Sequence, residues 1–438
     1  MSSLPAEAAG SSAAVPFLPL DRETVERLSL GRGEPDWLRE HRVRALQRYL
    51  ETSAPSGQEE EWRRFPLKDL PAARLADLVD TKHPPSEYGS IPVSAAHHGL
   101  IFDRMQTVTR EQPDRVRPWL QPSEGAGRSS GPDSHASFRA LADALFAHGS
   151  TFLYVPAGLH VELPLEVHKR WSAGTEPIVF RTVVVAEANS SVTLVEELSS
   201  ESGGPRVAIP SLEVHAGPGA RVRYVGIHRF AEDVWEVGQQ HAVSARDSVL
   251  ASFNVLVGSA RTKLGVTSEI RGDGAEVKLY GLVAAHDRQL IDVNTFQRLD
   301  GKGSTSDSLY LSALYDHAKA VNYGVIRVEP TSSGTGSYQE CRNMLLSDKA
   351  GADPIPVLEI LTNDVARCGH GATAGALDPD EMFYVMTRGL ARRDAEQLLV
   401  RGFYQRVVSA IPEPQVRARV LAALEPRIGR VAELEAAA

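Results

Sequence analysis

The chain has 438 residues, with 47 lysine and arginine residues against 56 aspartate and glutamate residues, for a net charge of −9. Its 42% apolar content is typical of a globular protein, and its length is typical of two or three domains. The sequence has neither an apolar run that could span a membrane nor a secretory leader, so we expect a cytoplasmic protein. The acidic balance argues against nucleic acid as a ligand. Two cysteines are too few for a disulfide framework or a four-cysteine metal site.

The N-terminal part of the chain is predicted to be a helical domain that follows a disordered tail. Residues 1–16 are mostly Ala, Ser, Gly and Pro and have little to bury. Residues 17–116 form the predicted domain, in which apolar residues recur at helical spacing and Asp36 is a candidate N-cap. Residues 117–137 are rich in Gly, Ser and Pro and are predicted to be a linker.

Residues 138–376 are predicted to form the β core, because the apolar period changes there from helical to alternating. Similar turns precede successive strands, at Asn189-Ser-Ser-Val192, Gly219-Ala-Arg-Val222, Arg246-Asp-Ser-Val249, Gly274-Ala-Glu-Val277 and Lys302-Gly-Ser-Thr305. A repeat of 27 to 30 residues is typical of one coil of a β-helix, whose equivalent turns stack on one another. A β-sandwich or jelly roll is the alternative, since it also consists of many short strands with glycine turns.

Residues 377–438 are predicted to form a C-terminal helical domain. Asp378 is a candidate N-cap, Pro379 would occupy the first helical position, and the helix would stop near Gly389. Two further helices follow, the first over about 392–411. The predicted fold is therefore mainly β, with a β-helix core between two α-helical domains.

Most familiar enzyme signatures are missing from the sequence. It contains no phosphate loop, so we expect no ATP binding by the chain itself. The adjacent acids Glu196-Glu197 and Glu232-Asp233 would point to opposite faces of a strand, so a solvated turn or edge is the simpler interpretation of each pair. His160 and His168 lack the spacing of a cupin metal site and are interpreted as core or surface residues.

Cys341, Cys368 and His370 are the candidate ligand residues. The cysteines are 27 residues apart, which predicts equivalent positions on adjacent coils, on the order of 5 Å apart. His370 follows Cys368 by two residues and would share its face of the strand. Thiolate and imidazole ligands suit iron or an iron–sulfur cluster, and three groups would need completion by a partner. The alternative is that both cysteines simply fill space.

A family resemblance rests on a long C-terminal motif. The segments are Arg367-Cys-Gly-His-Gly-Ala-Thr-Ala-Gly375, Leu377-Asp378, Glu381-Met-Phe-Tyr384 and Thr387-Arg-Gly-Leu390, supported by Tyr338-Gln339, Arg342 to Lys349, Pro356-x-Leu-Glu-Ile360, Tyr154 to Gly158 and Glu61-Trp62-Arg63. Over about 59–421, the chain resembles the SufB/SufD family of iron–sulfur cluster assembly proteins, and its SufD members in particular.

The resemblance implies a right-handed parallel β-helix in a non-catalytic scaffold subunit. Such a subunit pairs with SufB through the β-helix, docks the SufC ATPase through its C-terminal helices, and shares a transient Fe–S cluster with SufB. His370 matches a family histidine at that interface. Cys341 matches the cluster-building cysteine of SufB, where SufD sequences usually carry another residue.

Cys341 therefore leaves a homodimeric, SufB-like cluster carrier as an alternative function. A β-helical carbohydrate-active enzyme is a further alternative that rests on the fold alone. We expect the SufC-docking surface around Phe403 and Tyr404.

Overall fold

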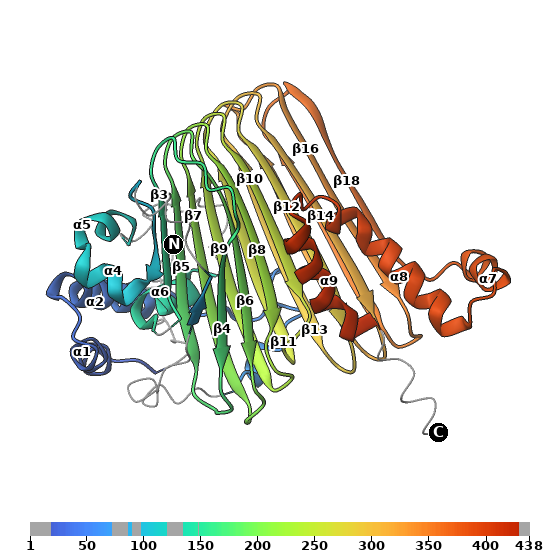
Figure 1. The fold of residues 1–438 in the computed structure, drawn as a ribbon, viewed down its shortest axis with the longest axis horizontal. Helices are drawn as coiled ribbons and strands as arrows, with labels where there is room; N and C mark the ends of the chain where they lie inside the picture. The colour runs from blue at the N-terminus through green and yellow to red at the C-terminus, as the bar shows by residue number, and fades with distance from the viewer. Residues whose placement is uncertain (1–18, 72–85, 90–97, 121–134, 148, 429–438) are drawn as a thin grey trace, which may run out of the picture.

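The structure, a computed structural model, describes residues 19–71, 86–89, 98–120, 135–147 and 149–428 (Figure 1). The predicted tail and most of the predicted linker lie outside these ranges. None of the helices in the described ranges is long and apolar enough to cross a membrane.

Two nine-stranded sheets form the body of the molecule. Sheet A contains, in spatial order, β1 (Ser86–Tyr88), β4 (Leu165–Trp171), β6 (Ser191–Ser200), β8 (Arg221–Arg229), β10 (Val249–Leu256), β12 (Glu276–Ala285), β14 (Thr305–Leu314), β16 (Thr335–Leu345) and β18 (Val365–Ala376). Sheet B contains β2 (Ile101–Arg104), β3 (Thr151–Val155), β5 (Ile178–Ala186), β7 (Arg206–Ala216), β9 (Val234–Ser244), β11 (Arg261–Ile270), β13 (Leu290–Leu299), β15 (Lys319–Val328) and β17 (Gly351–Ile360).

The chain alternates between the two sheets and so winds as a β-helix. Apart from β1 and β2, which pair antiparallel, each strand pairs in parallel with the strand one coil away. The predicted parallel β-helix is confirmed. The sandwich and jelly-roll alternative is wrong, because those folds are built from antiparallel strands.

The predicted turn repeat is a stack of left-handed residues. Asn189, Gly219, Asp247, Gly274 and Gly303 all have φ between 57° and 68°, a region that Gly, Asn and Asp tolerate best. The Gly219 N–H donates to Arg246 O of the next coil at 2.8 Å, and the other turns repeat this bond. The predicted repeat was one residue off at two of its turns, because Val222 pairs with Leu250 and not with Val249, and Val277 pairs with Ser306 and not with Thr305.

Side chains that point inward from both sheets form the main core. On β11 these are Leu264, Val266 and Ile270, which alternate with outward residues as the strand period requires. The terminal helices cover part of the outer face of each sheet, so strands such as β3 and β5 are buried on both sides (Figure 1).

The N-terminal helices cover the outer face of sheet B at its first coils. They are α1 (Arg22–Gly31), α2 (Asp36–Glu51), η1 (Leu67–Asp69), α4 (Met105–Glu111), α5 (Pro113–Val116), η3 (Arg117–Trp119) and α6 (Ala136–Leu145). Pro35, not Asp36, is the N-cap of α2, so that prediction was wrong by one residue. The predicted start of the core at residue 138 falls inside α6, whose apolar face packs against α2 and β5.

The C-terminal helices are α7 (Pro379–Thr387), α8 (Arg392–Val408) and α9 (Pro414–Ile428). The predicted N-cap is confirmed, because the Asp378 carboxylate accepts from the Asp380 N–H at 2.8 Å. Helices α8 and α9 pack on the outer face of sheet A, whereas α7 projects away from the solenoid (Figure 1).

Candidate functional site at the C-terminal end of the β-helix

The candidate ligand residues lie at the end of the solenoid where the coils stop. Strands β17 and β18 are the outermost strands of their sheets, and no other described strand pairs with their far sides. Both are long, and their residues are partly or fully exposed. An open strand edge presents unpaired backbone N–H and C=O groups that can hydrogen-bond to another strand.

The two cysteines are not at equivalent positions, so the prediction from their spacing was wrong. Cys341 on β16 pairs with Ala372, and Cys368 on β18 pairs with Ser337. The last coils are 31 residues long rather than 27, which offsets the cysteines by four residues along the strands. At about 3.3 Å per residue and about 4.8 Å between strands, their Cα atoms are about 14 Å apart.

His370 lies closer to Cys341 than Cys368 does. It pairs with Gln339, two residues before Cys341, which places the two Cα atoms about 8 Å apart. Both cysteines pack against the inner core, so His370, two residues after Cys368, also faces the inner side. His370 is nevertheless exposed, because no described coil follows β18.

Glycines flank His370 because the ring of Tyr338 occupies the outer side of β18. A methyl group added at Gly371 would lie 2.9 Å from the Tyr338 hydroxyl, and one at Gly369 would lie 3.3 Å from the ring. In the Gly-His-Gly pattern, the histidine therefore points its imidazole inward, and the two glycines leave room for the Tyr338 ring on the outer side.

Cys341 is half-buried against the end of the inner core, and its thiol is held in the protonated form. Its Sγ accepts a hydrogen bond from Asn343 Nδ2 at 3.3 Å. Burial raises the pKa of the Cys341 thiol to about 11, and the Asn343 bond opposes that rise only in part. A cavity of about 30 Å³, lined also by Gln339 and Tyr310, lies beside it and has room for about one water molecule.

Cys368 is a partly exposed residue of the edge strand. Its sulfur accepts a hydrogen bond from Ser337 Oγ at 3.2 Å. Within the described ranges, no group of three or more His, Cys, Asp or Glu side chains is close enough to hold a metal ion. The candidate ligand residues of the described chain are therefore not gathered into a metal site.

The structure does not place Tyr404 on a docking surface, so that expectation is corrected. Tyr404 is buried between α8 and sheet A, and its hydroxyl donates to Val283 O at 2.6 Å. Phe403 is partly buried against the same apolar cluster. Both aromatic residues seat α8 on the β-helix.

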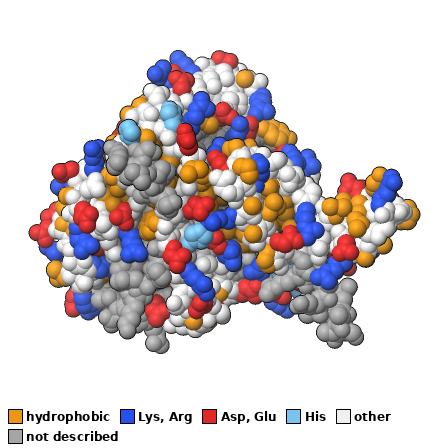
Figure 2. All heavy atoms as spheres, in the orientation of Figure 1, with side chains coloured by type: hydrophobic (Ala, Val, Ile, Leu, Met, Phe, Trp, Pro, Cys, Tyr) orange, Lys and Arg blue, Asp and Glu red, His pale blue; other side chains and the backbone are white. Residues whose placement is uncertain are grey.

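Exposed apolar residues instead gather on α7. Phe383 is 69% exposed and Tyr384 is 58% exposed, and the projecting arm at the right of Figure 2 carries this apolar surface. A groove of about 560 Å³ runs between α7 and the end of β16 and is lined by Leu345, Met382 and Met386, among others.

The remaining sequence candidates have structural roles. Glu196 and Glu197 do point to opposite faces, as predicted, but Glu196 is not solvated: it is buried beside Lys169, with 2.6 Å between Oε1 and Nζ. Glu197 lies on the outer face of sheet A and is paired with Arg229. His160 lies at the surface, where its Nδ1 is 3.0 Å from the hydroxyl of Ser191.

Sequence reasoning missed the open edge of β17 and the apolar surface of α7. Pro354 and Pro356 were a usable signal for the edge, because proline within a sheet is confined to edges and bulges. Phe383 and Tyr384 were quoted as motif residues, but helical periodicity alone does not show which aromatic residues stay exposed.

Comparisons with known proteins identify the family of the chain. The family model described as "SUF system FeS cluster assembly, SufBD core domain" matches residues 170–403. The chain is 27% identical to "Iron-sulfur cluster assembly protein SufD" of Bacillus subtilis, over 94% of this chain and 98% of that protein. It is also 27% identical to a SufBD family protein of Mycobacterium leprae, over 85% and 90% of the two chains. The identity to SufB of B. subtilis is 23%, over 90% of each chain. The chain therefore belongs to the SufBD family of SUF-system iron–sulfur cluster assembly proteins.

Proposed function

We propose that this chain is the SufD-like scaffold subunit of a SUF assembly complex, which pairs with SufB and docks the SufC ATPase. The observation that carries the proposal is the end of the β-helix, where the described strands leave the edges of β17 and β18 open and His370 on β18 is exposed. The greater similarity to SufD than to SufB of B. subtilis supports the SufD-like role. The carbohydrate-active alternative rested on fold alone, and no observation at this end favours it.

Pairing with SufB would complete both edges. A partner strand added to β17 or β18 satisfies backbone groups that otherwise face solvent, which is how strand addition gains affinity. It would also bury the half-exposed apolar residues at the end of β17, among them Ile360, which is 41% exposed, and Leu361 just beyond it. SufB is the partner that the family relationship suggests.

His370 is the proposed ligand of the nascent cluster on this chain. Its imidazole is exposed, whereas the Cys341 side chain is half-buried and burial raises the pKa of its thiol to about 11. Thiolate is the form of cysteine that binds metal, so Cys341 becomes a ligand only if it is exposed or deprotonated. Cys368 lies on the same strand face as His370 and precedes it by only two residues in the sequence.

SufC docking is proposed at α7 rather than at the predicted Phe403 and Tyr404. The exposed Phe383 and Tyr384 provide the kind of aromatic anchors that dominate protein interfaces. Because α8 is fixed to sheet A through the buried Tyr404, a partner held at α7 would also be held at a set position relative to β16.

The test of the His370 assignment is reconstitution of the complex. We expect the His370→Ala variant to co-purify with SufB and SufC but to accumulate much less iron and sulfide than the wild type. His160→Ala is the matched control, because His160 is also exposed but lies at the first coils. Cluster assembly that is equal in all three proteins would remove His370 from the proposal.

The test of the SufC surface is a pull-down with a surface variant. Phe383→Ser should weaken SufC capture about tenfold or more, as expected for an aromatic anchor, without a change in thermal stability. Leu30→Ser on α1 is the control, since Leu30 is 64% exposed at the other end of the molecule. Undiminished capture by the Phe383 variant would exclude α7 as the site.

A further inference from the structure

The outer face of the edge strand β17 carries two acids and no base. Ala352 and Leu358 pack into the inner core, whereas Ile355 packs against the outer aromatic cluster, so odd-numbered residues face outward. Asp353 and Glu359 are therefore both on the outer face. The strand Gly351–Ile360 contains no lysine, arginine or histidine.

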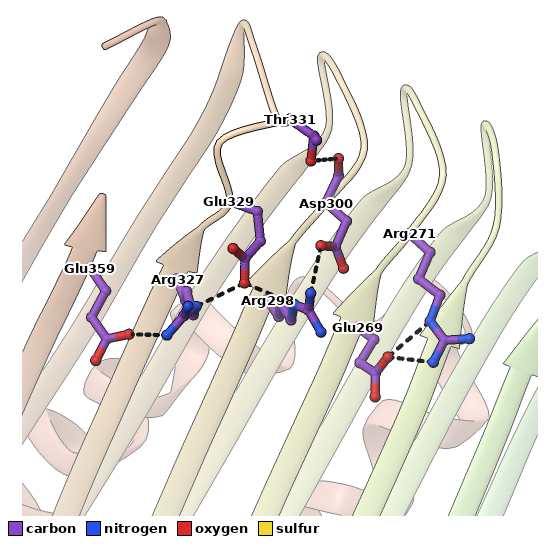
Figure 3. A network of polar contacts seen from close by, with 8 residues as sticks. All are labelled: Glu269, Arg271, Arg298, Asp300, Arg327, Glu329, Thr331 and Glu359. Carbon is purple, nitrogen blue, oxygen red and sulfur yellow. Dashed lines mark hydrogen bonds and ion pairs between the residues drawn. The ribbon is translucent and has the colours of Figure 1, made fainter. Parts of the chain in front are cut away.

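Glu359 is the last charge of an ion-pair ladder across sheet B. Arg298 bridges Asp300 on its own strand's end and Glu329 of the next coil, at 3.1 and 3.0 Å (Figure 3). Arg327 then bridges Glu329 and Glu359, at 2.8 and 3.1 Å. The ladder stops at Glu359, whose side chain is 37% exposed.

Asp353 is the second open acid of this edge. Its nearest cation is Arg64, at 3.5 Å from Nε to Oδ2, and its side chain is 62% exposed. Each acid is thus paired with a cation of this chain on one side. On its other side lies the position that a further strand would occupy beside β17. A lysine or arginine on such a strand would continue the ladder, in which acids and arginines alternate.

The backbone of β17 also restricts what can pair with it. The Gly351 N–H donates to Ala318 O, just before β15, and the Leu361 N–H donates to Val328 O at the end of β15. Odd-numbered residues therefore point their backbone groups toward β15, and even-numbered residues point theirs toward the open edge. Pro354 and Pro356 are even-numbered, so two donors are missing from that edge.

Self-pairing of two β17 strands is therefore unfavourable. Two copies joined end to end by a two-fold axis bring their β17 strands together antiparallel. Pairing centred on Pro356 places Asp353 of each copy opposite Glu359 of the other and aligns positions that lack donors. Like charges directly opposite each other destabilise a strand pair, and every other symmetric register leaves four carboxylates without a new cation.

We infer that Asp353 and Glu359 determine the specificity of this edge: they disfavour a second copy of this chain and select a partner strand with lysine or arginine opposite them. The inference rests on the proposed pairing of this end with SufB. It assigns the selection to two named carboxylates on one strand face.

The first test measures self-association of the chain by analytical ultracentrifugation. Relative to the wild type, Asp353→Asn/Glu359→Gln should self-associate about tenfold more tightly, because two repulsive cross-strand contacts are removed. Asp353→Lys/Glu359→Lys should not self-associate, but its equimolar mixture with the wild type should form heterodimers. Glu40→Lys/Glu51→Lys, which changes the net charge equally on α2, should behave as the wild type.

Two results of this test would overturn the inference. One is an equimolar mixture that associates no better than the wild type alone. The other is a wild-type chain that dimerises while the double lysine variant does not. That result would show that β17 pairs with β18 of a second copy, which carries Arg367.

The second test separates this inference from the proposed function. The affinity for the cognate SufB is measured for the wild type, the double lysine variant and the α2 control. The lysine variant should bind SufB at least tenfold more weakly than the wild type, and the α2 control should bind it equally well. Equal binding by the lysine variant would overturn the inference while leaving the SufB pairing intact. A wild type that does not bind SufB would instead refute the proposed function.

Discussion

The chemistry of Cys341 gives the sharpest quantitative prediction. Burial in the last coils raises the pKa of its thiol from 9.0 to about 11. Only the thiolate is nucleophilic, so a shift of about two pKa units lowers the reactive fraction about 100-fold. At pH 8 that fraction is about 0.1%, against about 10% for a thiol with a pKa of 9.0.

Alkylation by iodoacetamide, followed by mass spectrometry of the two cysteine peptides, measures this directly. We expect Cys341 in the folded chain to react about 100-fold more slowly at pH 8 than in the urea-unfolded chain, and its rate to rise about tenfold per pH unit up to pH 10. The Cys368 peptide of the same sample is the internal reference for the alkylation reaction. A Cys341 rate at pH 8 that unfolding leaves unchanged would refute a thiol whose pKa burial raises.

Two further predictions concern a hydrogen bond that holds α8 on the solenoid and an ion pair within sheet B. Tyr404→Phe removes the hydrogen bond to Val283 O and should cost about 1 kcal/mol in urea unfolding while SufC binding stays unchanged; lost binding at full stability would restore Tyr404 as a docking residue. Burial alone would raise the pKa of Glu213, but the charge of Arg181 lowers it from 4.5 to about 2. About 3 kcal/mol of stability is therefore present above pH 4.5 and lost as the pH falls toward 2, and Glu213→Gln should flatten this loss in acid-unfolding curves; an unchanged acid slope would contradict the assignment.

The solenoid could be predicted from the sequence because its turns repeat a physical requirement. Each coil needs one residue that tolerates a left-handed backbone, and Asn189, Gly219 and Asp247 meet that need at nearly regular intervals. The register could not be predicted with the same accuracy. Coil length changes from 27 residues between Leu250 and Val277 to 31 between Cys341 and Ala372, so a spacing of 27 no longer marks one coil at the end that matters.

The candidate site was predicted in part. The motif identified His370, and strand alternation placed it on the same face as Cys368, as the structure has it. The burial of Tyr404 was not predictable, because α8 carries apolar residues on several sides and only its contact with sheet A decides which of them are covered. The same contact leaves Phe383 on α7 exposed.

The exposure of His370 and the open edge of β18 have one cause, and this links partner binding to ligand completion. Gln339, which holds the same inward position one coil earlier, is only 5% exposed because β18 covers it. His370 lacks such cover, so the strand that would bury it is also the strand that would satisfy the backbone of β18. That strand would bring its own inward side chain to about 4.8 Å from the position of His370. A ligand from the partner would thus reach the imidazole only when the two chains are paired, and cluster assembly would depend on that pairing.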